Sequence, residues 1–430
     1  MQRLNSASGD FAARFRALVE AGRGEGGDVS AAVRTIIEDV RQRGDAAIAE
    51  LTARFDGFDP AGELRIPTGR IDAALKRVDK DLLAAMELAA SRIRAFHEVQ
   101  RPADHQQVDE TGTRTGWRYS PIAAAGLYVP GGRAALFSSV LMNAIPAKVA
   151  GVEQLVMVTP TPGGEPNDEV LAAAKLAGVD TIYRIGGAQA VAALAFGTES
   201  VPAVDFIAGP GNAFVAEAKR QLYGRIGIDM VAGPSEILIV ADSGADPAVL
   251  AADLLSQAEH DPTSQSILIT DSPSLAQAVL AALPAAFDAI STAETARASW
   301  DANGAVIEIA DLSEAPALID ALAPEHLLLA VRDPDAVFAR VRHAGSVFLG
   351  YDTPEAIGDY LAGPNHVLPT GRRARFSSGL GTANFMKRTT FLGCGPEGFQ
   401  ALGPPAARLA EAEGLPAHAL SITRRLDRGA

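Results

Sequence analysis

Residues 353–371 carry a carboxylate and an imidazole, Asp359 and His366, in a segment with three glycines and three prolines. Glycine and proline at this density exclude a long helix and a central strand, so the segment is predicted to be a shaped loop. In a loop held by a rigid scaffold, the two side chains could be two metal ligands, or one metal ligand and one substrate contact. The alternative is a surface loop in which both residues cap turns.

A second pair of candidate ligands lies in residues 254–262, LLSQAEHDP. Gln257 and His260 are three positions apart at a predicted helix end, so both project from one face. Pro262 stops the helix and thereby sets the position of His260. A glutamine oxygen is an unusual metal ligand, but it suits a zinc site that also uses His and Asp. A solvated surface pair is the alternative.

Two further segments place polar side chains at the start of an element. Glu325 and His326 directly precede an apolar run, where an acid and an imidazole could share proton transfer on one substrate. Their alternative is a helix-to-strand turn with solvated side chains. His418 follows a helix stop in residues 411–421, EAEGLPAHALS, and its alternative is a frayed histidine near the chain end.

Four of these candidates have the donor types of a zinc site. They supply two imidazole nitrogens, one amide oxygen and one carboxylate oxygen, a set that suits zinc or a similar divalent ion. The four residues are Gln257, His260, Asp359 and His418.

Composition restricts the class of protein. The chain has 430 residues, 48% hydrophobic and 21% charged, which is typical of an enzyme-like globular protein of two or three domains. A net charge of −14 argues against a nucleic-acid partner, and no apolar run is long enough to span a membrane. The charged N-terminus lacks a secretory signal, so a cytoplasmic location is expected. Cys394 has no basic neighbour within five positions, so a thiol mechanism is not expected.

From about residue 121, short β-branched runs alternate with alanine-rich helical patterns, which predicts parallel sheets covered by helices. The expected strands are 155–159, 181–185, 206–208, 237–241, 266–270, 306–309, 327–331 and 346–349. Helices are expected at 166–177, 188–196, 212–222, 247–260, 274–289, 313–321 and 334–342. Two amphipathic helices are expected earlier, at 29–55 and 68–99.

The expected fold is therefore α/β, with two Rossmann-like parallel-sheet domains, one of them discontinuous. Residues 1–27 form an N-terminal helical segment in this division. Residues 28–120 and 235–377 form the discontinuous domain, residues 121–234 the other domain, and residues 378–430 a helical tail. Ligands in such folds bind at strand ends or between domains.

Three glycine-containing turns could face a dinucleotide. They are residues 128–132 (YVPGG), 186–190 (GGAQA) and 209–213 (GPGNA). The second and third each follow a short strand and open a helix, so their backbone amides could contact a pyrophosphate. Ordinary glycines of strand-to-helix turns are the alternative.

Taken in order and at these separations, the motifs resemble those of the histidinol dehydrogenases over about residues 28 to 425. The shared strings are YVPGG, GGAQAVAALAFGT, IAGPGN, GPSE, LLSQAEHDP, PEHL, IGDYLAGPNHVLPT and EGLPAHALS. The resemblance implies a homodimer that oxidises L-histidinol to L-histidine in two NAD-dependent steps, the last of histidine biosynthesis. It also implies one Zn²⁺ per subunit, active sites shared between subunits, and a C-terminal tail that reaches the partner.

The same resemblance implies a role for each candidate residue. Gln257, His260, Asp359 and His418 resemble the zinc ligands, with His418 supplied by the partner subunit, and zinc orients the substrate. His326 resembles the general base for the alcohol proton, and Glu325 resembles the residue that activates water to hydrate the aldehyde. The implied substrate contacts are Ser235, His366 and Glu413, together with His326 and the zinc ligands. The implied NAD contacts are Tyr128, Gln189 and Asn212.

Two alternatives to this function stay open. A related enzyme could oxidise another amino alcohol or a polyol and stop after one step. A zinc-binding structural or regulatory protein could keep the fold without catalysis, although Glu325 and His326 beside four candidate ligands argue against that.

Overall fold

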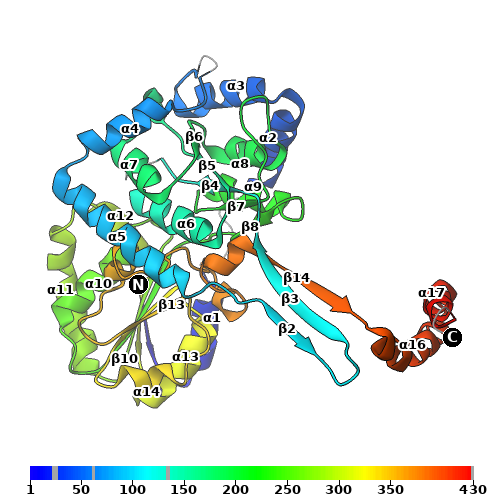
Figure 1. The fold of residues 1–430 in the computed structure, drawn as a ribbon. Coiled ribbons are helices and arrows are strands. Elements are labelled where there is room, and N and C mark those ends of the chain that lie inside the picture. The colour runs from blue at the N-terminus through cyan, green and yellow to red at the C-terminus, as the bar shows by residue number, and fades with distance from the viewer. Residues whose placement is uncertain (22–27, 61–62, 132–135, 428–430) are drawn as a thin grey trace.

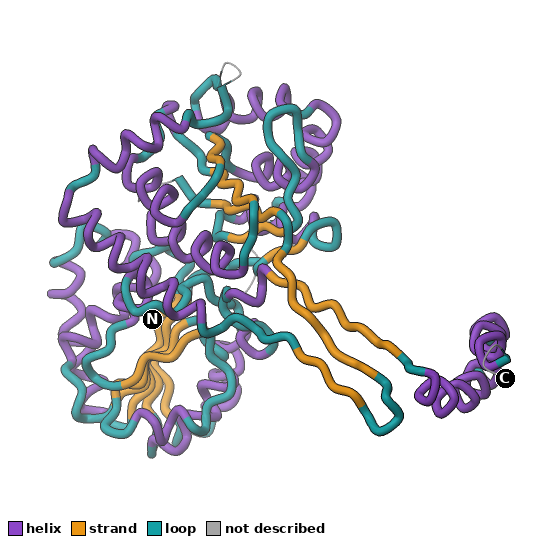
Figure 2. Tube along the Cα trace, viewed as in Figure 1, coloured by secondary structure: helices purple, strands orange, loops and turns teal. Residues whose placement is uncertain are grey.

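The computed structural model describes residues 1–21, 28–60, 63–131 and 136–427 of the chain. In that part of the chain the strands form one five-stranded sheet, one six-stranded sheet and one three-stranded sheet. Figures 1 and 2 show two α/β units side by side, with a long antiparallel arm that extends away from both. The two parallel sheets confirm the α/β fold class expected from the sequence.

The five-stranded sheet is parallel throughout, in the order β6-β5-β4-β7-β8. Its strands are β4 (Ala124–Tyr128), β5 (Gln154–Val158), β6 (Thr181–Tyr183), β7 (Phe206–Ala208) and β8 (Gly227–Ile228). The helices that connect them are α6 (Phe137–Ala150), α7 (Asp168–Ala177), α8 (Gly187–Phe196) and α9 (Ala213–Leu222), with η1 (Pro162–Gly164). The strands are almost entirely apolar because helices bury both faces of the sheet.

The helices of residues 30–98 pack on this same unit. They are α2 (Ser30–Arg43), α3 (Asp45–Asp56), α4 (Thr68–Arg77) and α5 (Lys80–Glu98). Helix α2 contacts α8 and α9, α4 contacts α7, and α5 contacts α6. The expected division instead grouped residues 28–120 with the other unit. An amphipathic pattern reveals an apolar face but not which core that face will cover.

Each of the two long helices expected before residue 100 is divided in the structure. Gly44, with φ of +55°, separates α2 from α3. Asp79 starts α5 anew, because its carboxylate accepts hydrogen bonds from the backbone N–H groups of Asp81 and Leu82.

The six-stranded sheet is also parallel, in the order β1-β11-β10-β9-β12-β13. Its strands are β1 (Gln2–Asn5), β9 (Glu236–Ala241), β10 (Gln265–Thr270), β11 (Ala305–Glu308), β12 (His326–Ala330) and β13 (Ser346–Leu349). Its helices are α1 (Phe11–Glu20), α10 (Pro247–Ala258), α11 (Pro273–Asp288), α12 (Ala293–Asn303), η2 (Leu312–Glu314), α13 (Ala315–Leu322), α14 (Pro334–Phe338) and α15 (Glu355–Tyr360). The N-terminal segment, expected to be helical, contains helix α1, but its first residues form strand β1 of this sheet.

The arm consists of β2 (His105–Val108), β3 (Arg114–Pro121) and β14 (Met386–Gly393), which pair antiparallel. Short turns η3 (Arg373–Arg375) and η4 (Thr382–Phe385) precede β14, and α16 (Pro396–Ala412) and α17 (Pro416–Leu426) follow it. The C-terminal helices were expected, whereas β14 was not. Figure 1 shows both helices beyond the end of the arm, away from the two sheets. No helix in the described ranges combines the length and apolarity needed to cross a membrane.

Candidate active site

His326 is the first residue of β12 and is held in one tautomer. Its ring is buried, and Nδ1 lies 3.0 Å from the backbone oxygen of Glu236. Because a carbonyl oxygen only accepts, Nδ1 carries the proton and Nε2 does not. Nε2 is buried without a hydrogen-bond partner. Burial lowers the pKa of His326, so the ring is neutral with a free acceptor nitrogen.

Glu325 lies beside this imidazole. One of its carboxylate oxygens accepts a hydrogen bond of 2.9 Å from the backbone N–H of Glu236 and lies 3.7 Å from His326 Nδ1. Burial raises the pKa of Glu325 well above its ordinary value, and the nearby carboxylates of Glu236, Asp359 and Glu355 add to this. A carboxylate in such surroundings is a stronger base than one in water.

Helix α15 adds two carboxylates on one face, Glu355 and Asp359. Glu355 Oε2 accepts a hydrogen bond of 3.1 Å from Ser256, whereas Glu355 Oε1 is buried without a partner. His326 Nε2 lies 3.7 Å from Glu355 Oε1 and 4.0 Å from Asp359 Oδ1. Burial, together with the charge of Glu355, raises the pKa of Asp359 to about 8. Clustered carboxylates with an unpaired oxygen form a site that a cation would stabilise.

The ligand atoms of His326, Glu355 and Asp359 lie within 4.8 Å of one another, close enough to hold one metal ion. Of these three, the sequence predicted only Asp359 as a metal ligand. Glu355 was missed, because a second carboxylate four residues before Asp359 does not by itself distinguish a ligand from a solvated side chain.

Helix α10 contacts this cluster through the hydrogen bond from Ser256 to Glu355, and Gln257 follows Ser256 in the same helix. Gln257 is buried, and its Oε1 is without a hydrogen-bond partner. His260 follows the helix end, where its N–H lies 3.3 Å from the Gln257 carbonyl oxygen, and its ring is exposed. The charge of His260 affects the pKa of both His326 and His366, which places all three imidazoles in one neighbourhood.

His366 connects the cluster to the other α/β unit. Its Nδ1 donates to the backbone oxygen of Asp359 at 3.0 Å, and its Nε2 lies 3.5 Å from the Ser139 hydroxyl near the start of α6. Burial lowers the pKa of His366 to about 4, so the ring is neutral. The neighbouring Asn365 donates to Met142 O at 2.6 Å and lies 3.3 Å from His97 Nε2. Ser139, Asn365 and the buried His97 are supporting residues that sequence reasoning missed.

Ser235 lies in the turn before β9 and directly precedes Glu236, whose backbone hydrogen-bonds to both Glu325 and His326. In that turn the N–H of Gly233 donates to the Thr370 hydroxyl at 2.7 Å. The N–H of Gly371 donates to Glu236 at 3.0 Å. The end of the loop 353–371 is thus attached to the amino end of β9, where His326 also lies.

The three candidate NAD contacts lie together at the carboxyl edge of the five-stranded sheet. Tyr128 ends β4, Gln189 lies in the first turn of α8, and Asn212 caps α9 through hydrogen bonds to Phe214 N and Val215 N. The Tyr128 hydroxyl accepts a hydrogen bond of 3.0 Å from Gly187 N. Gly132 of the first glycine turn lies outside the described residues.

The carboxyl edge of one sheet therefore meets the amino edge of the other. The carboxyl edge of the five-stranded sheet carries the candidate NAD contacts, and the amino edge of the six-stranded sheet carries His326 and its neighbours. Ser139 and His366 join the two edges, and only residues 229–235 separate the end of β8 from the start of β9.

Glu413 and His418 are not brought to this site within the chain. Both are exposed, Glu413 at the end of α16 and His418 in α17, beyond the end of the arm in Figure 1. Cys394, also exposed, lies at the base of these helices rather than at the site.

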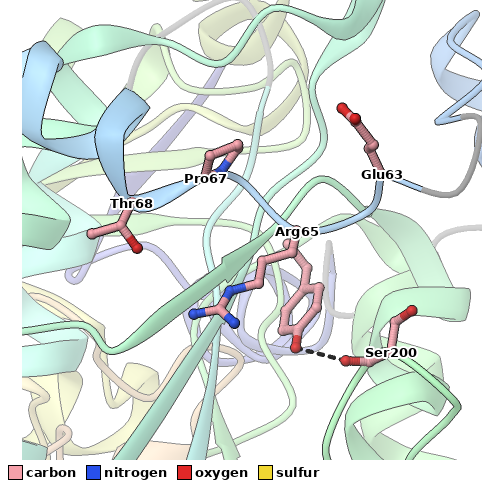
Figure 3. A pocket seen from close by; sticks show the side chains of 6 residues that line it. Glu63, Arg65, Pro67, Thr68 and Ser200 are labelled. Atoms are coloured by element: carbon pink, nitrogen blue, oxygen red, sulfur yellow. Dashed lines mark hydrogen bonds between the residues drawn. The ribbon is translucent and has the colours of Figure 1, made fainter.

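A separate hollow of about 590 Å³ opens on the surface beside β6, lined by Glu63, Arg65, Pro67, Thr68, Tyr183 and Ser200 (Figure 3). Its Tyr183 hydroxyl donates to the Ser200 backbone oxygen at 2.7 Å. None of the lining residues is a candidate catalytic, metal or NAD residue.

Comparison with known proteins agrees with the motifs. The histidinol dehydrogenase family model matches residues 21–426. The chain is 60% identical to histidinol dehydrogenase of Zymomonas mobilis and 59% identical to that of Rhodospirillum rubrum, in each case over 99% of both chains. The crystal structure of histidinol dehydrogenase from Elizabethkingia anophelis superposes with a TM-score of 0.95 at 36% identity, covering 100% of this chain and 98% of the other. The chain belongs to the histidinol dehydrogenase family.

Proposed function

We propose that this protein oxidises L-histidinol to L-histidine, through the aldehyde L-histidinal, with two NAD per substrate and one zinc ion per subunit. The observation that carries the proposal is the buried His326, whose unprotonated Nε2 has no partner and lies beside Glu325 in a chain of this family. An alcohol oxidation needs a base of this kind, and the second oxidation needs a group that activates water.

The residues present fit a zinc ion. Gln257 Oε1 is a buried oxygen without a hydrogen-bond partner, and Asp359 is a carboxylate whose pKa is raised by burial and by Glu355. Both features are unfavourable unless a cation is bound. We assign Gln257, His260 and Asp359 of one subunit, with His418 of the partner subunit, as the ligands. When bound, the ion orients the substrate's imidazole and amino nitrogens.

In the first oxidation, His326 Nε2 accepts the alcohol proton while hydride leaves the carbinol carbon. NAD, when bound, accepts one hydride in each oxidation. The hydrogen bond from Nδ1–H to Glu236 O keeps Nε2 free to act as the base and stabilises the ring once it is protonated.

In the second oxidation, Glu325 takes a proton from the water that adds to the aldehyde carbon. The resulting hydrate loses its hydride and a proton to give the carboxylic acid. The raised pKa of Glu325 makes it a more effective acceptor of the water proton than an exposed carboxylate. The exposed Cys394 at the far end of the arm agrees with water, rather than a thiol, as the nucleophile.

The remaining candidates act in binding. His366, which joins the two units, and Ser235, in the turn before β9, are assigned to the substrate, together with Glu413. Tyr128, Gln189 and Asn212, at the carboxyl edge of the five-stranded sheet, are assigned to NAD.

We further propose a homodimer in which each arm carries its two helices to the partner's site. The support is that α16 and α17 lie away from both sheets, with Leu402, Leu409 and Leu420 between 45% and 68% exposed. Apolar side chains at this exposure on an extended arm favour burial against a second chain.

The stoichiometry of NADH tests the function. Limiting histidinol incubated with excess NAD is expected to yield two NADH per histidinol without released aldehyde, and removal of the metal by a chelator is expected to abolish NADH formation. A yield of one NADH would indicate a dehydrogenase that stops at the aldehyde. Inactivity with histidinol while another amino alcohol or polyol reduces NAD would reassign the substrate.

A further inference from the structure

A buried ion pair lies behind the candidate NAD contacts. Lys219 of α9 pairs with Asp229, the residue after β8, and both side chains are only 1% exposed. Removing two charges from water is unfavourable unless both are well paired and hydrogen bonded. None of the steps proposed above uses this pair, so its position calls for another explanation.

The ion pair hydrogen-bonds to both backbone polar groups of Gly209, its N–H and its C=O. Gly209 N–H donates to Asp229 Oδ2 at 2.8 Å, and Lys219 Nζ donates to Gly209 O at 3.0 Å. The other Asp229 oxygen accepts from Met230 N–H at 2.6 Å. The ion pair therefore fixes the peptide groups on either side of Gly209.

Gly209 is held in a conformation that only glycine adopts readily. Its φ is +116°, and a Cβ atom there would lie 2.0 Å from Tyr128 O. The turn that starts at Gly209 is pressed against the end of β4, and three residues later Asn212 caps α9. The two candidate NAD contacts, Tyr128 and Asn212, thus flank the residue that the ion pair fixes.

We propose that Lys219 and Asp229 are positioning residues for NAD. They hold the turn of residues 209–212 against Tyr128, in the geometry in which Asn212 and the turn's backbone face the dinucleotide. This inference rests on the proposed function, because it takes Tyr128 and Asn212 as NAD contacts. It predicts that loss of the pair weakens NAD binding and leaves histidinol binding at the other sheet edge unchanged.

The test uses a double variant, Lys219→Met with Asp229→Asn, because either single change strands an unpaired charge in the interior and can prevent folding. The control is Lys148→Met with Asp180→Asn, a more exposed Lys–Asp pair at the opposite edge of the same sheet. The Lys148 Nζ to Asp180 distance is 2.8 Å, the side chains are 23% and 44% exposed, and Asp180 also accepts a hydrogen bond of 2.8 Å from the backbone N–H of Leu155.

The double variant is expected to fold with nearly unchanged Tm, and its KM for NAD is expected to rise about tenfold or more, since small misplacements of a binding turn are costly. Its KM for histidinol should stay within about twofold of the wild type. NADH binding measured by fluorescence should weaken by the same factor, and amide exchange at Gly209, Gly211 and Asn212 should accelerate. The control variant should match the wild type, and Lys219→Arg should recover most of the NADH affinity.

Unchanged NADH affinity in a folded double variant would overturn the proposal. So would equal losses of NADH and histidinol affinity accompanied by a lower Tm, because these indicate general destabilisation. NADH binding and amide exchange are measured without histidinol. A wild-type enzyme that binds NADH but fails to oxidise histidinol would therefore refute the proposed function and leave this test intact.

Discussion

The imidazole of His326 is buried and neutral, and one of its ring nitrogens has no hydrogen-bond partner. A buried polar atom without a partner costs stability, so its retention in a packed site favours a functional purpose. The competing interpretation is that Nε2 is itself a metal ligand, because it lies within 4.8 Å of ligand atoms of Glu355 and Asp359. Substitution distinguishes the two.

We predict that His326→Ala lowers kcat by about 10²–10⁴-fold, the usual contribution of a positioned base, and leaves zinc bound. Zinc content by atomic emission and NADH formation are measured on the same sample. The matched control is His343→Ala, which removes a half-buried imidazole outside the site and should leave both unchanged. Loss of zinc from the His326 variant would place this residue in the metal shell.

Part of the site follows from residue types alone. Gln257, His260 and Asp359 became candidates because amide, imidazole and carboxylate groups together are the donor types of a zinc site, although each motif alone also fits a solvated surface turn. Glu355 and His97 could not be found in this way. His97 lies in an ordinary helical pattern and Glu355 in a segment expected to be a loop. Only tertiary packing buries Glu355 beside His326 and His97 beside Asn365.

At the scale of elements, α15 carries two of the site carboxylates and depends on one small residue. A Cβ atom on Gly358 would lie 2.5 Å from the ring of Phe348 in β13. That ring lies 6.1 Å, centroid to centroid, from the imidazole of His326. The absence of a side chain at Gly358 therefore sets how closely Glu355 and Asp359 approach the base.

Gly358→Ala is accordingly expected to displace α15, because Phe348 is buried and has little room to move. We predict a loss of stability of about 1–3 kcal/mol, the usual cost of overpacking, and weaker zinc binding. Thermal melting and zinc titration check this, with Ile357→Ala, a 49% exposed neighbour, as the control. A variant that keeps the Tm and zinc affinity of the wild type would show that α15 tolerates the displacement.

The elements themselves were largely predictable from the sequence. The bounds expected for β7 and β13 are those observed, because short β-branched runs between glycines and helical patterns are typical of buried parallel strands. Strands β1, β2, β3, β4, β8 and β14 were missed. Strands β1, β2, β3 and β14 are at least partly exposed and show no clear buried run, whereas the fully buried β4, with the sequence AAGLY, contains no β-branched residue.

At the scale of the whole molecule, the arm separates His418 from the other proposed ligands of the same chain. No local pattern could have predicted this separation, since it depends on β14 pairing with β3, more than 250 residues earlier in the sequence. The proposed dimer removes the separation by exchange of arms between subunits.

We predict that a His418→Ala chain mixed with a His260→Ala chain recovers activity. In a mixed dimer with shared sites, one site keeps both histidines and the other loses both, so random mixing should restore about one quarter of the wild-type rate. Activity of co-refolded chains is compared with each variant alone and with a mixture of two His260→Ala preparations. No recovery in a verified mixed dimer would show that each site is built within one chain.

Because the carboxyl edge of one sheet meets the amino edge of the other, the helices of the two units present opposite ends of their dipoles to the site. Helices α8 and α9 present their N-terminal, positive ends at the edge assigned to NAD, whereas the C-terminal, negative end of α10 lies at Glu355, to which Ser256 donates a hydrogen bond. One side thus favours a pyrophosphate, and the other a metal ion and a protonated amine. If NAD binds at the first edge and the substrate at the second, as proposed, these dipoles would favour the transfer of negative charge, as hydride, from the substrate toward NAD.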